Sequence, residues 1–321
     1  MRQPETAGGR GWRAALAVYA HPRVIGMALL GFSAGLPLLL VGGTFSAWLS
    51  DLGVSRTDIG FLSWVGLAHS LKIFWAPLID RLPIPFFTRL LGKRRGWMLL
   101  TQLGIAGALL GMSLVDPSNA LALVAALAVL TAFASATQDI AIDAYRIEAV
   151  PETMQGAMAS TYVFGYRVAL LAAGAGALHL AEIGDWSLAY GGMAALMLIG
   201  IGCTLIVREP EVARDANSEA LEQRVVDFLD RTHHTGWQRD LRAWFIGAVV
   251  CPFAEFFTRY RWHAAAILVL IGTFRISDIF MGVMANPFYL DLGFSKGEIA
   301  NIAAAFGLAM TLSGAAMGGL L

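Results

Sequence analysis

The chain has 321 residues, of which 57% are hydrophobic and only 14% are charged, and it carries 23 basic and 23 acidic side chains. Soluble domains have about a quarter of their residues charged, so this composition excludes a soluble globular protein and predicts an all-α membrane protein. Cys203 and Cys251 have no spacing typical of a disulfide framework or a metal site.

Hydrophobic stretches predict six membrane-spanning helices after a basic leader at residues 1–22, which we expect on the cytoplasmic surface. Each stretch is near the roughly 20 residues that cross the hydrocarbon core. Several glycines and Pro37 in the first stretch predict close helix contact and a local break. The six spans are expected at residues 24–49, 58–82, 97–115, 120–145, 156–181 and 186–207.

A polar stretch follows at residues 208–262 and is predicted to be a central cytoplasmic loop. Apolar residues from Leu221 to Leu229 recur at helical spacing, which is typical of a surface helix. The apolar segment 243–253 is short and flanked by arginines, which favours an interfacial position. Two more spans are expected, at residues 263–289 and 297–321. The predicted domains are therefore 1–22, a six-helix bundle at 23–207, the loop at 208–262 and the first two helices of a second bundle at 263–321.

Basic residues are distributed very unevenly over the predicted loops. With the N-terminus in the cytoplasm, 18 of the 23 lie in inner segments, three lie within spans, and only Arg56 and Lys296 lie in outer loops. Because Lys and Arg are enriched in cytoplasmic loops, this bias predicts a cytoplasmic N-terminus.

One loop sequence occurs twice, as DLGVSRTDIG from Asp51 and as DLGFSKGEIA from Asp291, and five of the ten positions are identical. The offset of 240 residues contains six predicted spans, so both copies enter the membrane in the same direction. Transporters built from two parallel six-helix halves have this arrangement. The second half contains only two of the six spans that the repeat implies, so the sequence predicts a truncated chain. We expect that such a chain does not transport by itself.

Ionisable side chains inside predicted spans mark candidate functional positions, because a charge at the bilayer centre is costly unless it is paired. Asp139 and Asp143 are four residues apart and share one helix face in the fourth span. We predict that one of them pairs with Lys72, so that proton binding is coupled to a conformational change. Asp278 is a further candidate for proton coupling. The alternative is that Asp139 and Asp143 only cap a helix at the cytoplasmic interface.

The loop after the second span resembles the signature loop between helices 2 and 3 of the major facilitator superfamily. It contains Asp80-Arg81 and, after an insertion, the sequence GKRRG that includes Arg94. The resemblance implies that Asp80, Arg81 and Arg94 form a cytoplasmic gating lock between two halves. Anchoring by the positive-inside rule explains the basic cluster equally well but does not explain Asp80. The loop after the fourth span is similar to another loop of this superfamily, with Gln155 where Arg is usual.

Four stretches together resemble the AmpG muropeptide permeases: GFSAGLPLLL, ATQDIAIDAYRIE, PFAEFFTRY and PFYLDLGFSKGEIA. The resemblance implies a truncated major facilitator fold, with about 8 of 12 or more helices, in the bacterial inner membrane. It also implies proton-driven import of anhydro-muropeptides (GlcNAc-anhydroMurNAc peptides) from periplasm to cytoplasm. This import supplies peptidoglycan recycling and, in some bacteria, beta-lactamase induction.

Substrate contacts follow from this resemblance. Arg167 and Arg275 offer planar donors to substrate carboxylates, although Arg275 and Asp278 are three apart and could instead neutralise each other. Gln138 offers an amide to a sugar hydroxyl, but an amide that bridges two helices is equally common. Tyr166 could stack on a sugar ring or pack between helices. Gly35, within the GFSAGLPLLL stretch, completes the predicted substrate-binding set.

Two alternative functions remain open: a permease for another anionic metabolite, such as an acyl-coenzyme A, and a non-transporting membrane scaffold or sensor. The chain has no nucleophile spaced from a base, no metal cluster and no phosphate-cradling glycine loop. We therefore expect no enzyme activity, cofactor or metal. The expected partners are a muropeptide, protons and membrane lipid, with no nucleic acid, and the chain is expected to be a monomer.

Overall fold

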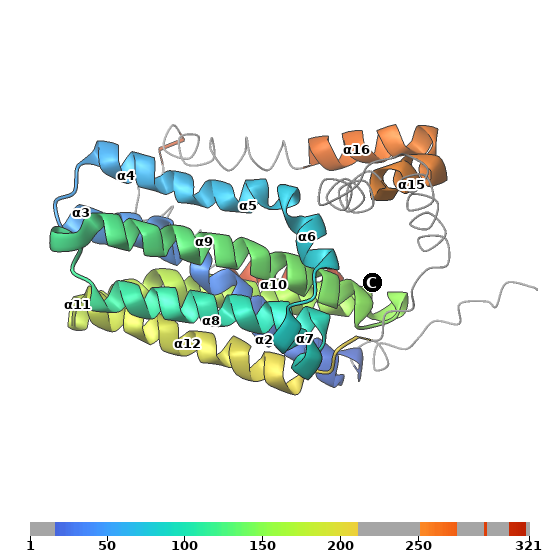
Figure 1. Ribbon diagram of the computed structural model, residues 1–321, viewed down its shortest axis with the longest axis horizontal. Coiled ribbons are helices and arrows are strands. Elements are labelled where there is room, and N and C mark those ends of the chain that lie inside the picture. The colour runs from blue at the N-terminus through green and yellow to red at the C-terminus, as the bar shows by residue number, and fades with distance from the viewer. Residues whose placement is uncertain (1–16, 211–250, 275–291, 294–307, 319–321) are drawn as a thin grey trace, which may run out of the picture. The chain divides into compact units, whose positions relative to one another are not determined.

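The structure is a computed structural model that describes residues 17–210, 251–274, 292–293 and 308–318 (Figure 1). The chain divides into two compact units, residues 1–211 with 311–321 and residues 212–310. Regular structure in the described part is helical, which confirms the predicted all-α class. Within that part, five helical segments are long and apolar enough to cross a membrane: Pro22–Asp51, Lys93–Leu114, Pro117–Glu148, Glu152–Ile183 and Trp186–Ile206.

The first span consists of two helices with a break between them. Helix α2 (Pro22–Leu40) ends at Val41, and α3 (Gly43–Asp51) begins after Gly42, whose ψ of −113° is not helical. Pro37 lies inside α2 and has no N–H to donate to the preceding turn. The local break predicted from Pro37 and the glycines is therefore confirmed.

The second predicted span differs most from its expectation, which was one continuous helix over residues 58–82. The structure instead has a series of short pieces that follow one another along α9 (Figure 1). Tighter 3₁₀ turns interrupt the α-helical hydrogen bonding at two points, and a proline stands in the first turn of α6. The pieces are α4 (Arg56–Leu62), η2 (Ser63–Gly66), α5 (Leu67–Leu71), η3 (Lys72–Phe74) and α6 (Ala76–Arg81), with α7 (Pro85–Leu91) after them.

The remaining helices of the first unit lie where the sequence predicts spans three to six. They are α8 (Lys93–Leu114), α9 (Pro117–Glu148), η4 (Glu152–Met154), α10 (Gln155–Leu171), η5 (Ala172–Gly176), α11 (Ala177–Ile183) and α12 (Trp186–Ile206). Side-chain caps begin two of them: Asp116 accepts from the Ser118 amide at 2.9 Å, and Asp185 accepts from the Leu188 amide at 2.6 Å. The hydrogen bonds from Ser118 lower the pKa of the Asp116 carboxyl.

Close backbone contact holds α2 against α10. A Cβ atom at Gly165 would lie 1.8 Å from the Ala28 carbonyl oxygen, and one at Gly31 would lie 2.3 Å from the Tyr162 carbonyl oxygen. Only glycine allows the two backbones to approach this closely. On the other side of the bundle, α8 packs between α9 and α12 (Figure 1).

After α12 in the chain, the structure describes α15 (Cys251–Tyr260), α16 (Trp262–Phe274) and α19 (Leu308–Gly318). Arg261 joins α15 to α16 with a φ of 47°, a left-handed conformation that is uncommon for a residue with a side chain. Helix α16 lies within the predicted seventh span and α19 within the eighth. The surface helix predicted at 221–229, most of segment 243–253 and the rest of both spans lie outside the described residues.

The glycine of the repeated DLG sequence has a positive φ in both copies. Gly53 has a φ of 73° and Gly293, at the equivalent position, has a φ of 88°. Positive φ favours glycine, so the shared glycine of the two DLG sequences is explained by a shared turn.

Candidate functional site

An ion pair joins the second and fourth predicted spans. Lys72 Nζ lies 3.3 Å from Asp139 Oδ2, and the two side chains are 32% and 14% exposed. Lys72 begins η3, and Asp139 lies on α9 after a long uncharged run. The predicted pairing of Lys72 with one of the two aspartates is confirmed for Asp139. The proton-coupling role of the pair stays a prediction.

The second oxygen of Asp139, Oδ1, is buried and has no hydrogen-bond partner among the described residues. Leaving a buried acceptor unsatisfied costs about 1–3 kcal/mol. Protonation would remove the charge of this carboxylate and turn one of its oxygens into a donor. The geometry therefore suits a carboxylate that exchanges a lysine partner for a proton.

Asp143 has a different partner from Asp139. It forms an ion pair with Arg146 at 3.4 Å, one turn further along α9, with side chains that are 43% and 28% exposed. The Arg146 guanidinium also lies 5.8 Å from the ring centroid of Tyr162, which in turn lies 5.9 Å from that of Tyr166. Sequence reasoning considered Tyr162, like Tyr166, for stacking on a sugar ring but assigned no pairing to Arg146, although the three-residue spacing of Asp143 and Arg146 was a usable signal for it.

An open groove of about 480 Å³ runs between the α5–α6 segment and α9. His69 lines it one turn before Lys72; its Nε2 lies 3.3 Å from Ser135 Oγ, and its Nδ1 is buried without a partner in the described part of the chain. The groove therefore brings several titratable side chains to one surface. Its lining consists of His69, Ser70, Lys72, Ala76, Asp80, Ile140, Asp143, Ala144 and Ile147.

Gln138 belongs to a buried polar network in the centre of the bundle. Its Nε2 donates to Ser33 Oγ at 2.7 Å, and Gln102 Nε2 donates to the same oxygen at 3.3 Å. Thr204 Oγ1 then donates to Gln102 Oε1 at 2.8 Å. Gln138 thus bridges two helices, as the alternative explanation expected. Its Oε1 is buried without a described partner, and its role in substrate binding stays a prediction.

The other predicted substrate residues lie at or near the α2–α10 contact. A Cβ at Gly35 would lie 2.6 Å from the Tyr166 carbonyl oxygen, so Gly35 is buried in helix packing. Tyr166 is half-buried and Arg167 is exposed. Arg167 forms no ion pair with a described residue. Arg275 and Asp278 lie outside the described residues.

Arg94 forms the centre of a charge cluster at the expected cytoplasmic end of the bundle. It is 7% exposed, and its Nη1 donates to Asp80 Oδ1 at 2.6 Å. Its Nε and Nη2 donate to the two oxygens of Glu148 at 2.9 and 2.5 Å. This two-pronged geometry is the strongest that arginine forms with a carboxylate. The cluster connects α6, α8 and α9, and the side chain of Arg81 lies outside the described part. The gating role of these residues stays a prediction.

Glu209 completes the cluster and was missed by sequence reasoning. Its two carboxylate oxygens accept from the backbone amides of Arg94 and Arg95, at 2.7 and 3.0 Å. The Arg95 side chain donates in return to the carbonyl oxygens of Thr204 and Leu205, at 2.9 and 2.7 Å. An anion therefore caps the start of α8, and a cation caps the end of α12.

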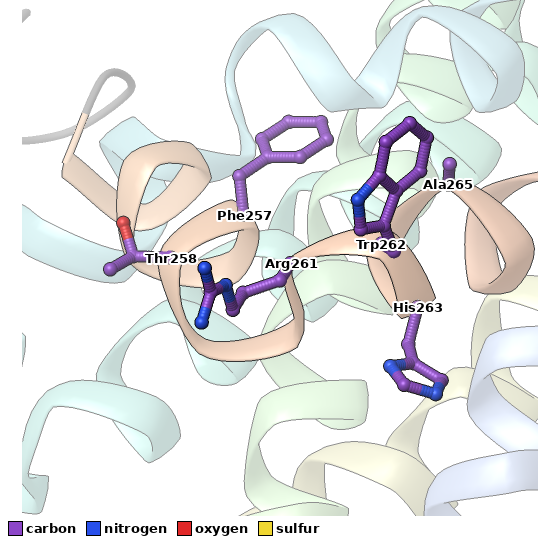
Figure 2. A pocket seen from close by; sticks show the side chains of 6 residues that line it. All are labelled: Phe257, Thr258, Arg261, Trp262, His263 and Ala265. Carbon is purple, nitrogen blue, oxygen red and sulfur yellow. The ribbon is translucent and has the colours of Figure 1, made fainter.

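A second recess lies in the other unit, at the turn between α15 and α16 (Figure 2). In this view, the rings of Phe257 and Trp262 extend to the same side of the turn, and the side chain of Arg261 extends between the two helices. None of the predicted site residues lines this recess, so we do not assign it to the transport site. Its lining is Phe257, Thr258, Arg261, Trp262, His263 and Ala265.

Comparison with known proteins accounts for the combination of apolar helices with buried charges. Residues 25–321 match the family model of the Major Facilitator Superfamily. The chain belongs to this superfamily. It is therefore a multi-pass transporter of the bacterial inner membrane, as the sequence predicted.

Among relatives of this major facilitator protein, a transporter named AmpG 4 from Rickettsia conorii is 34% identical over 306 residues, which cover 95% of this chain and 68% of that one. The anhydromuropeptide permease of Escherichia coli K12 is 37% identical over 309 residues, which cover 95% of this chain and 56% of that one. The predicted resemblance to AmpG-type permeases is confirmed.

Proposed function

We propose that the protein is a proton-coupled permease that imports anhydromuropeptides from the periplasm to the cytoplasm for peptidoglycan recycling. The observation that carries the proposal is the 37% identity, over 95% of this chain, to a protein named anhydromuropeptide permease. The buried charges of the bundle supply a physical mechanism that fits such a transporter.

Coupling rests in this proposal on the Lys72–Asp139 pair. Protonation of Asp139 removes the attraction that holds Lys72 at 3.3 Å, so α5 and η3 are released from α9. The groove that contains both Lys72 and Asp143 then provides the route by which the proton leaves. Asp278, which lies outside the described residues, is the corresponding candidate in the second bundle.

Substrate recognition rests on Arg167, Tyr166 and Gln138. A cation without a described partner in the middle of a span favours an anionic ligand, and Arg167 matches the carboxylates of a peptide stem. The Tyr162–Tyr166 pair offers aromatic surface for a sugar ring, and Gln138 Oε1 is an available acceptor for a hydroxyl. Arg275 is assigned to the same substrate, and Gly35 brings α2 close enough for these groups to converge.

Gating is assigned to the charge cluster of Asp80, Arg81 and Arg94, extended by Glu148. Arg94 is held by two carboxylates, so its release requires both ion pairs to break. A conformational change that separates α6 from α8 would open the cytoplasmic end of the groove.

Uptake of radiolabelled GlcNAc-anhydroMurNAc-tripeptide tests the proposal, in cells that lack their own permease and express this chain together with the remaining helices of the second bundle. We expect saturable uptake that a protonophore abolishes and that D139N lowers by about tenfold or more. R89Q removes an exposed arginine of α7 that contacts none of these groups, and should leave uptake unchanged. If an acyl-coenzyme A competes for uptake and unlabelled muropeptide does not, the protein is instead a permease for that other anionic metabolite. Absence of uptake by protein that is folded in the membrane would favour a scaffold or sensor.

A further inference from the structure

A basic recess lies at the expected cytoplasmic end of the bundle, separate from the groove of the proposed transport site. It occupies about 500 Å³ where the start of α2 meets the end of α12 (Figure 1). Among the described residues, its lining contains two arginines and a histidine and no acidic side chain. The lining consists of His21, Pro22, Arg23, Ile206, Val207 and Arg208.

The charges of this recess are not neutralised by the described part of the protein. Arg23 and Arg208 form no ion pair with a described residue. Arg23 Nη1 donates to the Ala149 carbonyl oxygen, which fixes the side chain without removing its charge. Glu209, the next residue along from Arg208, binds the start of α8 through both carboxylate oxygens. Two positive side chains therefore face one cavity with no counter-ion among the residues that the structure describes.

The remaining lining of the recess is apolar and faces outward. Ile206 is 83% exposed at the end of α12. Val207 anchors this end to α2, because a Cβ atom at Gly26 would lie 2.9 Å from Val207 Cγ1. The start of α2 adds the positive end of the helix dipole. A phosphate beside the arginines would thus have hydrocarbon surface within its reach.

We propose that this recess binds the phosphate of an anionic phospholipid headgroup in the cytoplasmic leaflet, with Arg23 and Arg208 as the phosphate ligands and Ile206 against an acyl chain. Basic pockets between helices on the cytoplasmic side are suited to such headgroups. A free phosphate would satisfy the arginines equally well but would make no use of Ile206. The inference goes beyond the proposed function, because it does not depend on which substrate the permease carries.

Native mass spectrometry of the delipidated full chain, titrated with phosphatidylglycerol, tests the proposal. Each juxtamembrane arginine contributes roughly fivefold to binding of an anionic lipid. We expect R208Q to weaken binding by roughly fivefold and R23Q/R208Q by roughly twentyfold. R89Q is the matched control, since Arg89 is an exposed arginine on α7 outside the recess, and it should bind as the unchanged protein does. R23K/R208K keeps both charges and should stay within about twofold of the unchanged protein, because a lysine contributes about as much as an arginine to attraction by an anionic surface.

Two further probes separate the sources of the phosphate. Glycerol phosphate, which has the headgroup without acyl chains, should bind far more weakly than phosphatidylglycerol, and phosphatidylcholine should not depend on either arginine. Equal binding of phosphatidylglycerol by R23Q/R208Q and R89Q would overturn the proposal, and so would equal binding of glycerol phosphate and the lipid. If R23Q/R208Q fails to fold, R208Q decides the question, because Arg208 is exposed and has no ion pair in the described structure that its loss would break.

Discussion

Asp139 carries a carboxylate among the apolar residues of α9, and Lys72 is the cation beside it. Removing one member of a buried pair leaves the other charge without compensation, whereas removing both avoids that penalty. We predict that K72M and D139N each lower the free energy of unfolding by about 1–3 kcal/mol. This loss is smaller than that expected for a fully buried pair, because Lys72 is partly exposed. The double variant should recover a large part of the loss, which denaturant unfolding in detergent measures.

The Asp143–Arg146 pair is the control for this double-mutant cycle. Asp143 is 43% exposed against 14% for Asp139, and its partner lies three residues away on the same helix, so the coupling energy of this pair should be about 0.5 kcal/mol or less. Additive effects of K72M and D139N would show that the 3.3 Å contact contributes nothing to stability.

Single residues were predictable from the sequence where they broke a pattern. Lys72 and Asp139 are charges within apolar runs, so their pairing follows from the cost of an unpaired charge in a membrane. Ser33 and Glu209 break no pattern: a serine is ordinary in a span, and Glu209 lies in a loop already rich in charge. Their partners, Gln138 and the amides that begin α8, meet them only through tertiary packing.

At the scale of whole helices, the α2–α10 contact depends on glycine. An alanine at Gly165 would place its Cβ 1.8 Å from the Ala28 carbonyl oxygen, so the helices must separate. We predict that G165A lowers the free energy of unfolding by about 1–3 kcal/mol. G107A is the matched control, because a Cβ at Gly107 in α8 meets nothing within 4 Å. It should be neutral or stabilising by up to about 1 kcal/mol. Equal loss in both variants would contradict the close approach; thermal unfolding compares them.

Glu209 and Arg95 form a clamp between the start of α8 and the end of α12. This clamp gives a second prediction for the helices. E209Q keeps the shape of Glu209 but removes the negative charge at the start of α8. We predict a loss of about 0.5–1 kcal/mol in the free energy of unfolding, together with faster proteolysis of the chain after residue 209. E152Q changes an exposed glutamate of η4 that lies outside these hydrogen bonds, and should leave both properties unchanged. An unaltered proteolysis rate in E209Q would show that the clamp does not hold the end of α12.

Helix positions were predictable because a span needs about 20 apolar residues, and α8, α9 and α12 contain such runs without interruption. The segment 58–82 is also mostly apolar, but its geometry differs from that of the continuous helices. Composition cannot show where 3₁₀ turns replace α-helical hydrogen bonds, as they do at η2 and η3, because packing against α9 decides the backbone there. The break after Pro37 was predictable because proline acts through its own covalent structure.

For the whole molecule, two features of the sequence agree on one topology. The basic residues lie almost entirely in segments expected inside, and the repeated DLG loop, offset by six predicted spans, starts the second bundle in the same direction as the first. The positive φ at both Gly53 and Gly293 adds a structural likeness between the copies. The domain boundaries and the monomeric state stay predictions. The orientation of the first unit can be tested directly, because its inner and outer loops both lie in the described part.

Labelling of single cysteines tests that orientation. Leu52, 40% exposed between α3 and α4, is expected outside, and Pro83, exposed between α6 and α7, is expected inside. In a C251S background, where the remaining Cys203 is buried, we predict that a membrane-impermeant maleimide labels L52C in intact spheroplasts and labels P83C only after lysis. The arginines and lysine that follow Pro83 cause this difference, because translocating them across the membrane is unfavourable. Labelling of P83C before lysis would show that the bundle has the opposite orientation. The charge cluster of Arg94 and the basic recess of Arg23 and Arg208 would then lie on the periplasmic side.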